Sequence, residues 1–337
     1  MSNVPHLMRA VIAEASTEPL RLVQVSTPRP RPGEVLVRVM ASAVNPLDAK
    51  ILAGIAEHAR QPLPAILGID MAGVVVTVGE DNMMFQAGDA VFGMAGGVGG
   101  HPGSLAEYMV VDGRLLAPKP ANLSFREAAA VPLTFITAWE GLVDRACVRP
   151  GQHVLVRGGA GGVGQMALQI ARARGAVTFG TGAPSARENI ERLGARFVDK
   201  EEAPAGVVAR ETGNKGFDIV FDTAGGVSLD ASFAMVRRFG HVVSALGWGT
   251  HSLAPLSLRA ASYSGIFTLL PLITGEGGAH HGEILAEAAK LAERGALVAD
   301  LDPRRFTLRT VEDAYRSIEA GTARGKLVVD IEEEIAS

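Results

Sequence analysis

The chain has 337 residues but a single cysteine, Cys147, and only 5% aromatic residues. One cysteine allows no internal disulfide and excludes a structural zinc site built from four cysteines. The formal net charge of -4 leaves no basic excess, which argues against nucleic acid as the main partner. The longest apolar run, from Gly265 to Thr274, is interrupted by Pro271 and is too short to span a membrane.

The amino-terminal segment from Met1 to His6 lacks a basic stretch followed by an apolar core. We therefore expect no signal peptide and a cytoplasmic location. The 47% hydrophobic and 20% charged content is that of an ordinary globular protein. Because this length exceeds what one compact core usually holds, we expect two domains.

Short runs with partial apolar alternation, typical of strands, dominate residues 1–125. They lie at residues 8–12, 20–25, 34–39, 73–78, 89–93 and 104–111. A glycine-rich loop, Gly93–Gly103, separates the last two runs. We predict a β-rich domain over 1–125 that residues 272–337 complete, ending in a strand at 326–331.

Strand-like and helical patterns alternate over residues 126–271, which predicts an α/β domain with a doubly wound parallel sheet. The expected strands cover 153–157, 176–181, 196–198, 217–223 and 241–246. The expected helices cover 125–131, 134–144, 185–193, 204–211 and 227–237, and the carboxyl-terminal region adds helices near 279–294 and 311–320.

An apolar run that ends in a cluster of glycines and is followed at once by a helical pattern is the most informative motif. Gly159, Gly161 and Gly164 have the G-x-G-x-x-G spacing. In a strand-turn-helix unit these glycines allow a tight turn, approach of the backbone to a pyrophosphate, and close packing of helix and strand. The flanking patterns therefore predict a dinucleotide-binding turn rather than an ordinary glycine-rich loop.

Five short motifs follow one another in an order that resembles a known protein family. They are 43–48 (AVNPLD), 67–75 (LGIDMAGVV), 103–108 (GSLAEY), 158–164 (GGAGGVG) and 325–329 (GKLVV). Together they resemble the zinc-independent quinone oxidoreductase branch of the medium-chain dehydrogenase/reductase superfamily. The resemblance implies a GroES-like catalytic domain, a Rossmann cofactor domain and a homodimer.

Zinc enzymes of the same superfamily have a cysteine and a histidine where this chain has Asn45 and Ile69. A catalytic zinc ion needs about three protein ligands from nitrogen, sulfur or oxygen. Asn45 and Ile69 cannot supply that set, so we predict that no metal is bound.

The expected end of the second Rossmann strand has no carboxylate before Glu188, although an NAD site usually places one there for the ribose hydroxyls. Ser185 and Arg187 offer instead a hydroxyl and a fixed positive charge, which suit an adenosine phosphate. Comparison with the resembling family adds Lys200. NADPH is therefore the expected cofactor, against the alternative that Arg187 is simply exposed on a helix.

Further cofactor contacts are implied by the resemblance or by their position at strand ends, although packing alone explains each of them as well. They adjoin the glycine turn, follow a strand, or fall near the nicotinamide side: Thr137, Gly162, Val163, Thr181, Ala224, Ala245, Leu246, Phe267 and Lys326.

Asn45 and Lys50 are the expected catalytic residues, because an amide hydrogen and an ammonium group can stabilise negative charge on a substrate oxygen. Asp48 is as well suited to cap the short helix that follows as to take part in the chemistry, and both expectations stay open. Phe92, Trp248 and Phe267 are the aromatic side chains that could stack on a flat ring.

The expected function is NADPH-dependent, zinc-independent reduction of a small quinone. A reductase of enones or 2-alkenals would use the same site, and the sequence does not separate the two. A non-catalytic NADPH-binding protein is the alternative from another class. No nucleic acid or membrane partner is expected.

Overall fold

The computed structural model describes residues 4–16, 18–81 and 83–331. Met1–Asn3, part of the segment on which the absence of a signal peptide was argued, lie outside them. The chain forms two compact units, one of Met1–Leu133 with Leu269–Ser337 and one of Thr134–Thr268. The predicted boundaries at residues 125 and 271 differ from these because α2 (Phe125–Ala129) packs on strands of the first unit and α9 (Leu270–Thr274) also belongs to it.

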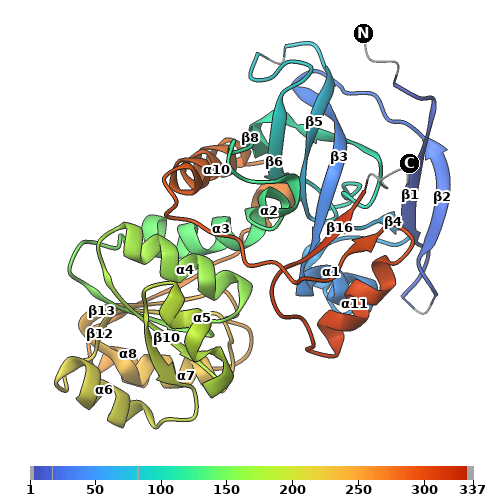
Figure 1. The fold of residues 1–337 in the computed structure, drawn as a ribbon. Coiled ribbons are helices and arrows are strands. Elements are labelled where there is room, and N and C mark those ends of the chain that lie inside the picture. The colour runs from blue at the N-terminus through green and yellow to red at the C-terminus, as the bar shows by residue number, and fades with distance from the viewer. Residues whose placement is uncertain (1–3, 17, 82, 332–337) are drawn as a thin grey trace. The chain divides into compact units, whose positions relative to one another are not determined.

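The first unit is β-rich, as predicted, and contains two sheets (Figure 1). The smaller sheet has the order β2-β1-β4. The larger has the order β15-β16-β3-β5-β6-β8, and β7 pairs with β3. These strands are β1 (Leu7–Ala13), β2 (Arg21–Ser26), β3 (Glu34–Val44), β4 (Ala65–Ile66), β5 (Asp70–Val78), β6 (Ala90–Met94), β7 (Tyr108–Asp112), β8 (Leu116–Pro118), β15 (Phe306–Thr307) and β16 (Leu327–Asp330).

Strand β16 brings the end of the described chain back to the first unit, as predicted from its apolar run. Leu327 pairs with Val44 and Asp330 with Ala41 in an antiparallel register. This pairing places Lys326 beside the end of β3, where α1 (Pro46–Leu52) begins. The other helices of this unit are the 3-10 turns η1 (Glu57–Ala59) and η2 (Gly113–Leu115), α10 (Gly278–Glu293) and α11 (Val311–Glu319).

The second unit contains one parallel sheet in the order β11-β10-β9-β12-β13-β14. Its strands are β9 (His153–Arg157), β10 (Val177–Gly182), β11 (Arg196–Asp199), β12 (Phe217–Asp222), β13 (Val236–Ser244) and β14 (Ser262–Gly265). The strand order reverses at β9, as in a doubly wound Rossmann sheet, so a ligand crevice is expected outside the carboxyl ends of β9 and β12. The α/β fold class predicted from the sequence is confirmed.

Helices connect these strands by crossovers, and the right-handed rule places α4 and α5 on one face of the sheet and α6 and α7 on the other (Figure 1). The helices are α3 (Pro132–Trp139), which enters this unit from the first, the π-helical turn η3 (Glu140–Arg145), α4 (Gly162–Ala173), η4 (Pro184–Ala186), α5 (Arg187–Arg192), α6 (Pro204–Thr212), α7 (Val227–Met235) and α8 (Ala254–Ser257). Phe179, Phe217 and Phe233 are buried in the core beside them.

The sixth strand, β14, was missed by the sequence analysis. It lies at the edge of the sheet with mostly exposed side chains, so its sequence shows no apolar alternation. The predicted helix 134–144 is interrupted at Glu140, where the π-helical turn begins. The apolar run Gly265–Thr274 ends in the five-residue helix α9. Within the described ranges, no helix has both the length and the apolarity needed to cross a membrane.

Helix α4 lies unusually close to the end of β9. A Cβ atom at Gly164 would stand 2.1 Å from the carbonyl oxygen of Gly158 and 2.8 Å from the Cα atom of Gly159. Gly161, three residues earlier, has φ −73° and its Cβ atom would lie 3.4 Å from its nearest neighbour, an ordinary contact. The third glycine of the motif therefore permits the packing, as predicted, whereas a Cβ atom at the second would make only an ordinary contact.

We expect Gly164→Ala to destabilise the protein more than Gly161→Ala, which replaces only the residue that precedes the first turn of α4. Alanine in a helix gains about 0.5–1 kcal/mol over glycine, but overpacking against rigid backbone costs about 1–3 kcal/mol or more. Thermal unfolding should show a Tm several degrees lower for Gly164→Ala. Equal Tm values for the two variants would contradict this close packing.

Candidate functional site

The glycine turn between β9 and α4 is held by a threonine of the neighbouring strand. Gly158, with φ +76°, donates its amide hydrogen to Thr181 Oγ1 at 3.0 Å. Gly159 donates its own to the Thr181 carbonyl oxygen at 2.9 Å. Thr181, predicted as a cofactor contact, is buried and orients the turn.

The amides of the first turn of α4, which includes Gly162 and Val163, have no acceptor within the helix. They and the positive end of the helix dipole suit a pyrophosphate. Gly161 has no side chain that would stand in the way of such a group.

The segment after β10 combines positive charge with the absence of a carboxylate at the strand end. Arg187 begins α5, and its guanidinium stacks on the Phe197 ring with 4.2 Å to the centroid. Its guanidinium also forms an ion pair with Glu191 at 3.2 Å, but both side chains are half-exposed. Such a pair contributes only about 0–1 kcal/mol, so Arg187 can exchange it for a phosphate group. Ser185 lies in the adjoining turn η4.

Lys200 is brought to the same place by the backbone. Its amide donates to the carbonyl oxygen of Gly182, the last residue of β10, at 3.0 Å. Its ammonium is half-exposed and pairs with Glu201 at 3.5 Å. The end of β10 thus gathers Ser185, Arg187 and Lys200, three groups that can donate to a phosphate.

The predicted contacts Ala224, Ala245 and Leu246 surround a buried carboxylate that the sequence analysis did not identify. Asp222 ends β12 with no exposed surface and accepts hydrogen bonds from the Ala224 and Gly225 amides at 3.3 and 2.7 Å. The Ser228 hydroxyl donates to its other oxygen at 2.6 Å. Ala245 donates its amide hydrogen to the Asp222 carbonyl oxygen at 3.1 Å. Asp222 therefore shapes the loops after β12 and β13.

Thr137 lies on α3 in a small polar cluster that the sequence also did not reveal. Thr268 donates its hydroxyl to Thr137 Oγ1 at 3.2 Å and to Glu140 Oε2 at 2.8 Å. Phe267, the neighbour of Thr268, stands edge to face with Trp248, with 6.1 Å between the ring centroids. The structure thus joins Thr137 to the segment that follows β14.

Asn45 lies in a buried charged cluster of the first unit. Its Nδ2 donates to Asp70 Oδ2 at 3.1 Å, and Lys326 Nζ donates to its Oδ1. Lys326 Nζ also lies 3.7 Å from Asp70 Oδ2. Asp70 is fully buried and its other oxygen accepts the Leu133 amide hydrogen at 2.9 Å. Lys326, expected on the nicotinamide side, therefore has Asn45 and Asp70 as its contacts.

Burial raises the pKa of Asp70, and the Lys326 ammonium opposes that rise. Burial also lowers the pKa of Lys326, while Asp70 and Asp48 raise it. Each charge thus favours the ionised form of the other, in a site where burial disfavours both. Within the cluster, the Lys326 side chain keeps 11% of its surface accessible, whereas Asp70 and Asn45 have almost none.

Asp48 lies beside the cluster of Asn45, Asp70 and Lys326. It caps the start of α1, which was one of the two roles expected for it. Its Oδ2 accepts the Asn45 amide hydrogen at 2.8 Å. Burial raises its pKa to about 7, and the negative charge of Asp70 adds to the rise. Among the described residues its Oδ1 has no hydrogen-bond partner, and the same holds for the buried Tyr315 hydroxyl, whose pKa burial and the nearby Asp48 raise.

Lys50 is exposed on α1, and in the described part of the chain it has no hydrogen bond or ion pair with Asn45, Asp70 or Lys326. Its charge acts on His58, whose pKa burial and Lys50 lower. The structure therefore brings Lys326, rather than Lys50, to Asn45.

The residues at the positions where zinc enzymes of the superfamily have a cysteine and a histidine are Asn45 and Ile69. Ile69 is buried and apolar, and the Asn45 amide oxygen is occupied by an ammonium group. Across residues 4–16, 18–81 and 83–331, no three histidine, cysteine, aspartate or glutamate side chains are grouped so that they could hold a metal ion. The donor set does not fit zinc.

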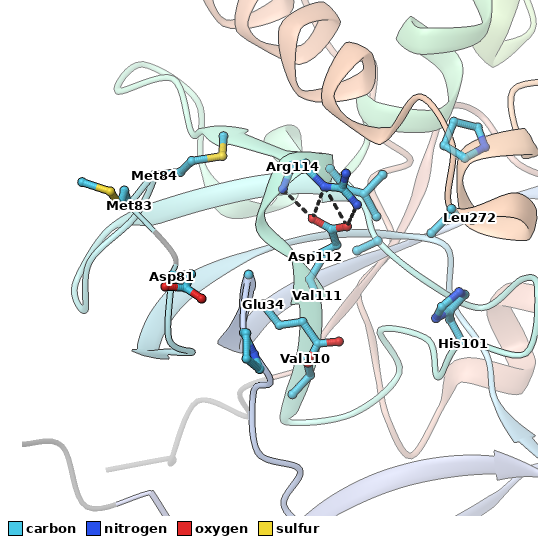
Figure 2. Close-up of a pocket in the computed structure, with 16 residues that line it drawn as sticks. Glu34, Asp81, Met83, Met84, His101, Val110, Val111, Asp112, Arg114 and Leu272 are labelled. Carbon is cyan, nitrogen blue, oxygen red and sulfur yellow. Dashed lines mark hydrogen bonds and ion pairs between the residues drawn. The ribbon is translucent and has the colours of Figure 1, made fainter.

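A separate cavity of about 460 Å³ lies in the first unit. Figure 2 shows Met83 and Met84 at one side of it and the pair of Asp112 and Arg114 at another. Arg114 NH2 lies 2.6 Å from Asp112 Oδ2, so these two charges compensate each other. None of the predicted site residues lines this cavity.

Two protein-family models match the chain. The alcohol dehydrogenase GroES-like domain matches residues 31–121, and the zinc-binding dehydrogenase family matches residues 193–329.

Curated relatives include enzymes and one much longer protein. Human quinone oxidoreductase is 32% identical over 340 residues, which cover 98% of this chain and 99% of that protein. The chloroplastic NADPH-dependent alkenal/one oxidoreductase of Arabidopsis thaliana is 33% identical over 314 residues, 90% of this chain and 74% of that protein. The spectinabilin polyketide synthase system protein NorB of Streptomyces orinoci is 36% identical over 88% of this chain, which spans only 13% of NorB.

Among solved structures, an alcohol dehydrogenase superfamily protein from Novosphingobium aromaticivorans is 53% identical, with a TM-score of 0.95. The match covers 96% of this chain and all of that one. The GroES-like and Rossmann folds expected from the sequence are confirmed by these matches.

We expect Asp48→Asn to remove a pH dependence of stability. Because the folded-state pKa of Asp48, about 7, exceeds the ordinary 3.8, its contribution is fully present below about pH 4 and is lost as the pH rises through 7. Asparagine keeps an oxygen for the Asn45 amide and has no charge to bury. Between pH 4 and 8 the wild type should therefore lose roughly a few kcal/mol of unfolding free energy relative to the variant.

Denaturant unfolding at several pH values checks this expectation. Glu57→Gln removes an exposed carboxylate from the nearby turn η1 and serves as the control. Parallel stability curves for the wild type and Asp48→Asn would show that Asp48 ionises normally.

Proposed function

The chain belongs to the medium-chain dehydrogenase/reductase superfamily as a quinone oxidoreductase-like protein, and on this premise we propose that it is an NADPH-dependent, metal-free reductase of quinone-type acceptors. The observation that carries the proposal is the Lys326 ammonium held by Asn45 and Asp70, at the place where zinc relatives have metal ligands.

Lys326 is the group of this cluster suited to act on a substrate. Its ammonium has three hydrogens, one of which it donates to Asn45, and its side chain retains accessible surface. Asn45 is nearly inaccessible, and its amide is engaged by Asp70 and Lys326. We therefore assign Asn45 to positioning Lys326, and Lys326 to stabilising negative charge on the acceptor oxygen.

The end of β10 supports NADPH as the cofactor. Arg187 is pre-oriented by its stacking on Phe197, and Ser185 and Lys200 add donors beside it. The glycine turn would hold the pyrophosphate, with Gly161, Gly162 and Val163 at the helix end. The Arabidopsis relative named NADPH-dependent agrees with this preference.

The nicotinamide, when bound, supplies a hydride. Reduction of a quinone to a hydroquinone takes up two electrons and two protons, so a hydride accounts for both electrons and one proton. The remaining proton comes from Lys326 or from water. What the protein contributes is alignment of donor and acceptor and a fixed positive charge near the forming anion.

Reduction of an enone or 2-alkenal remains the alternative, because the same charge would stabilise an enolate, and the Arabidopsis relative is named for alkenals and alkenones. A non-catalytic NADPH-binding role is the second alternative. The homodimer and the cytoplasmic location expected from the sequence stay predictions.

The function is tested by following NADPH and NADH absorbance with quinones, enones and alcohols, before and after treatment with a chelator. We expect quinones to oxidise NADPH, at a rate that the chelator does not change. Turnover with alcohols that depends on zinc would refute the proposal, and absence of all turnover with tight NADPH binding would favour the non-catalytic role.

The role of Lys326 is tested by the double variant Asp70→Asn/Lys326→Met. Removing one member of a buried ion pair costs about 3–5 kcal/mol, whereas replacing both members is often neutral, so the double variant should remain folded. Its kcat/KM for quinones should fall about 100-fold or more, with NADPH affinity retained. Lys50→Ala is the comparison: a larger loss in that variant would return the role to Lys50.

Arg187→Ala should weaken NADPH binding by about 10–100-fold, because a hydrogen bond to a charged group contributes about 1.5–3 kcal/mol. NADH binding should change little. Arg192→Ala, at the other end of α5, is the matched control. Cofactor fluorescence titrations measure each dissociation constant, and equal losses for NADPH and NADH would remove Arg187 from phosphate recognition.

A further inference from the structure

Two aromatic side chains meet at the carboxyl edge of the Rossmann sheet. Trp248 follows β13 and Phe267 follows β14, and these two strands are neighbours. Their rings stand edge to face, with an interplanar angle of 89°. Trp248 is 54% exposed, and it follows the carboxyl end of β13, the edge at which doubly wound sheets bind ligands.

The segment that carries Trp248 is held by His251. His251 Nδ1 lies 2.8 Å from Asp230 Oδ1, and Nε2 lies 3.3 Å from the Trp248 carbonyl oxygen. Both partners are acceptors, so both ring nitrogens donate when the imidazole is protonated. The Asp230 carboxylate accordingly raises the pKa of His251, and the charges of Asp230 and Asp222 both favour its cation.

Aromatic side chains also pack against the segment that carries Trp248. Phe233 on α7 stands edge to face with His251, with 6.2 Å between centroids, and with Tyr263, with 5.7 Å. The Tyr263 hydroxyl packs against Gly247, because it lies 2.1 Å from where a Cβ atom of residue 247 would be. Trp248 is therefore presented on a supported loop.

We propose that Trp248, backed by Phe267, is the surface on which a planar acceptor ring stacks, and that it makes the enzyme selective for fused-ring quinones over small enones and alkenals. The inference rests on the proposed reductase function and names its substrate class. An indole face is electron-rich and a quinone ring is electron-poor, so the two attract in offset stacking. A short alkenal has no ring with which to gain this contact.

Kinetics with NADPH and two acceptors, menadione and but-3-en-2-one, test the selectivity. Trp248→Ala should lower kcat/KM for menadione at least about 10-fold, which is about 1.4 kcal/mol, and change that for the small enone less than about 2-fold. Trp248→Phe should recover much of the loss. Phe239→Ala removes an exposed aromatic ring from the opposite half of β13 and should affect neither acceptor.

Equal losses on both acceptors, or no loss on either, would overturn the proposal while leaving the reductase function intact. If the wild type turns over neither acceptor, the proposed function fails instead, and a binding experiment then tests the inference.

The binding experiment uses tryptophan fluorescence, because Trp248 is one of only two tryptophans, and the other, Trp139, is buried. Menadione should then quench the intrinsic fluorescence saturably in the wild type and only linearly in Trp248→Phe, and identical quenching curves would refute the stacking surface.

Discussion

The most demanding interaction in the first unit is the one that stabilises the buried carboxylate of Asp70. Asp70 has no exposed surface, and a lone carboxylate in such a place would not stay ionised. Its partners are the Asn45 amide, the Leu133 backbone and the Lys326 ammonium. Each partner comes from a different part of the chain, far in sequence from Asp70. The pairing of β16 with β3 is what delivers Lys326 to this place. The register of β16 on β3 therefore also decides whether Asp70 has its positively charged partner.

Asp222 has the corresponding position in the second unit. It too is fully buried at the end of a strand, but its partners are backbone amides and hydroxyl groups within the loops that follow β12 and β13. These donors converge on the carboxylate from several sides, and the Arg157 guanidinium, which donates to the Ser228 hydroxyl, interacts electrostatically with Asp222. The Asp70 cluster differs in that its ammonium group, on Lys326, retains accessible surface. This difference is why we assign the chemistry to the Asp70 cluster and not to Asp222.

Much of this arrangement could be predicted from local sequence. The glycine spacing, the alternation of strands and helices, and the placement of Arg187 all follow from short-range patterns. Lys326 was noticed, but its partners were not, because residues 45 and 326 meet only through strand pairing across almost the whole chain. Edge strand β14 and the turn at Glu140 were missed for a related reason: tertiary packing, not periodicity, forms them. One signal was available for Asp70, a carboxylate inside the apolar run 69–75.

The exchange of a metal ion for a lysine ammonium bears on which acceptors suit such a site. Zinc lowers the pKa of a bound oxygen by several units and can hold an alkoxide near neutral pH. An ammonium supplies one charge and a proton, without coordination, and helps most where the product anion is already delocalised. Hydroquinone anions and enolates are of that kind, whereas a simple alkoxide is not. The role that we propose for Lys326, held by Asn45 and Asp70, therefore suits acceptors that carry their own stabilisation.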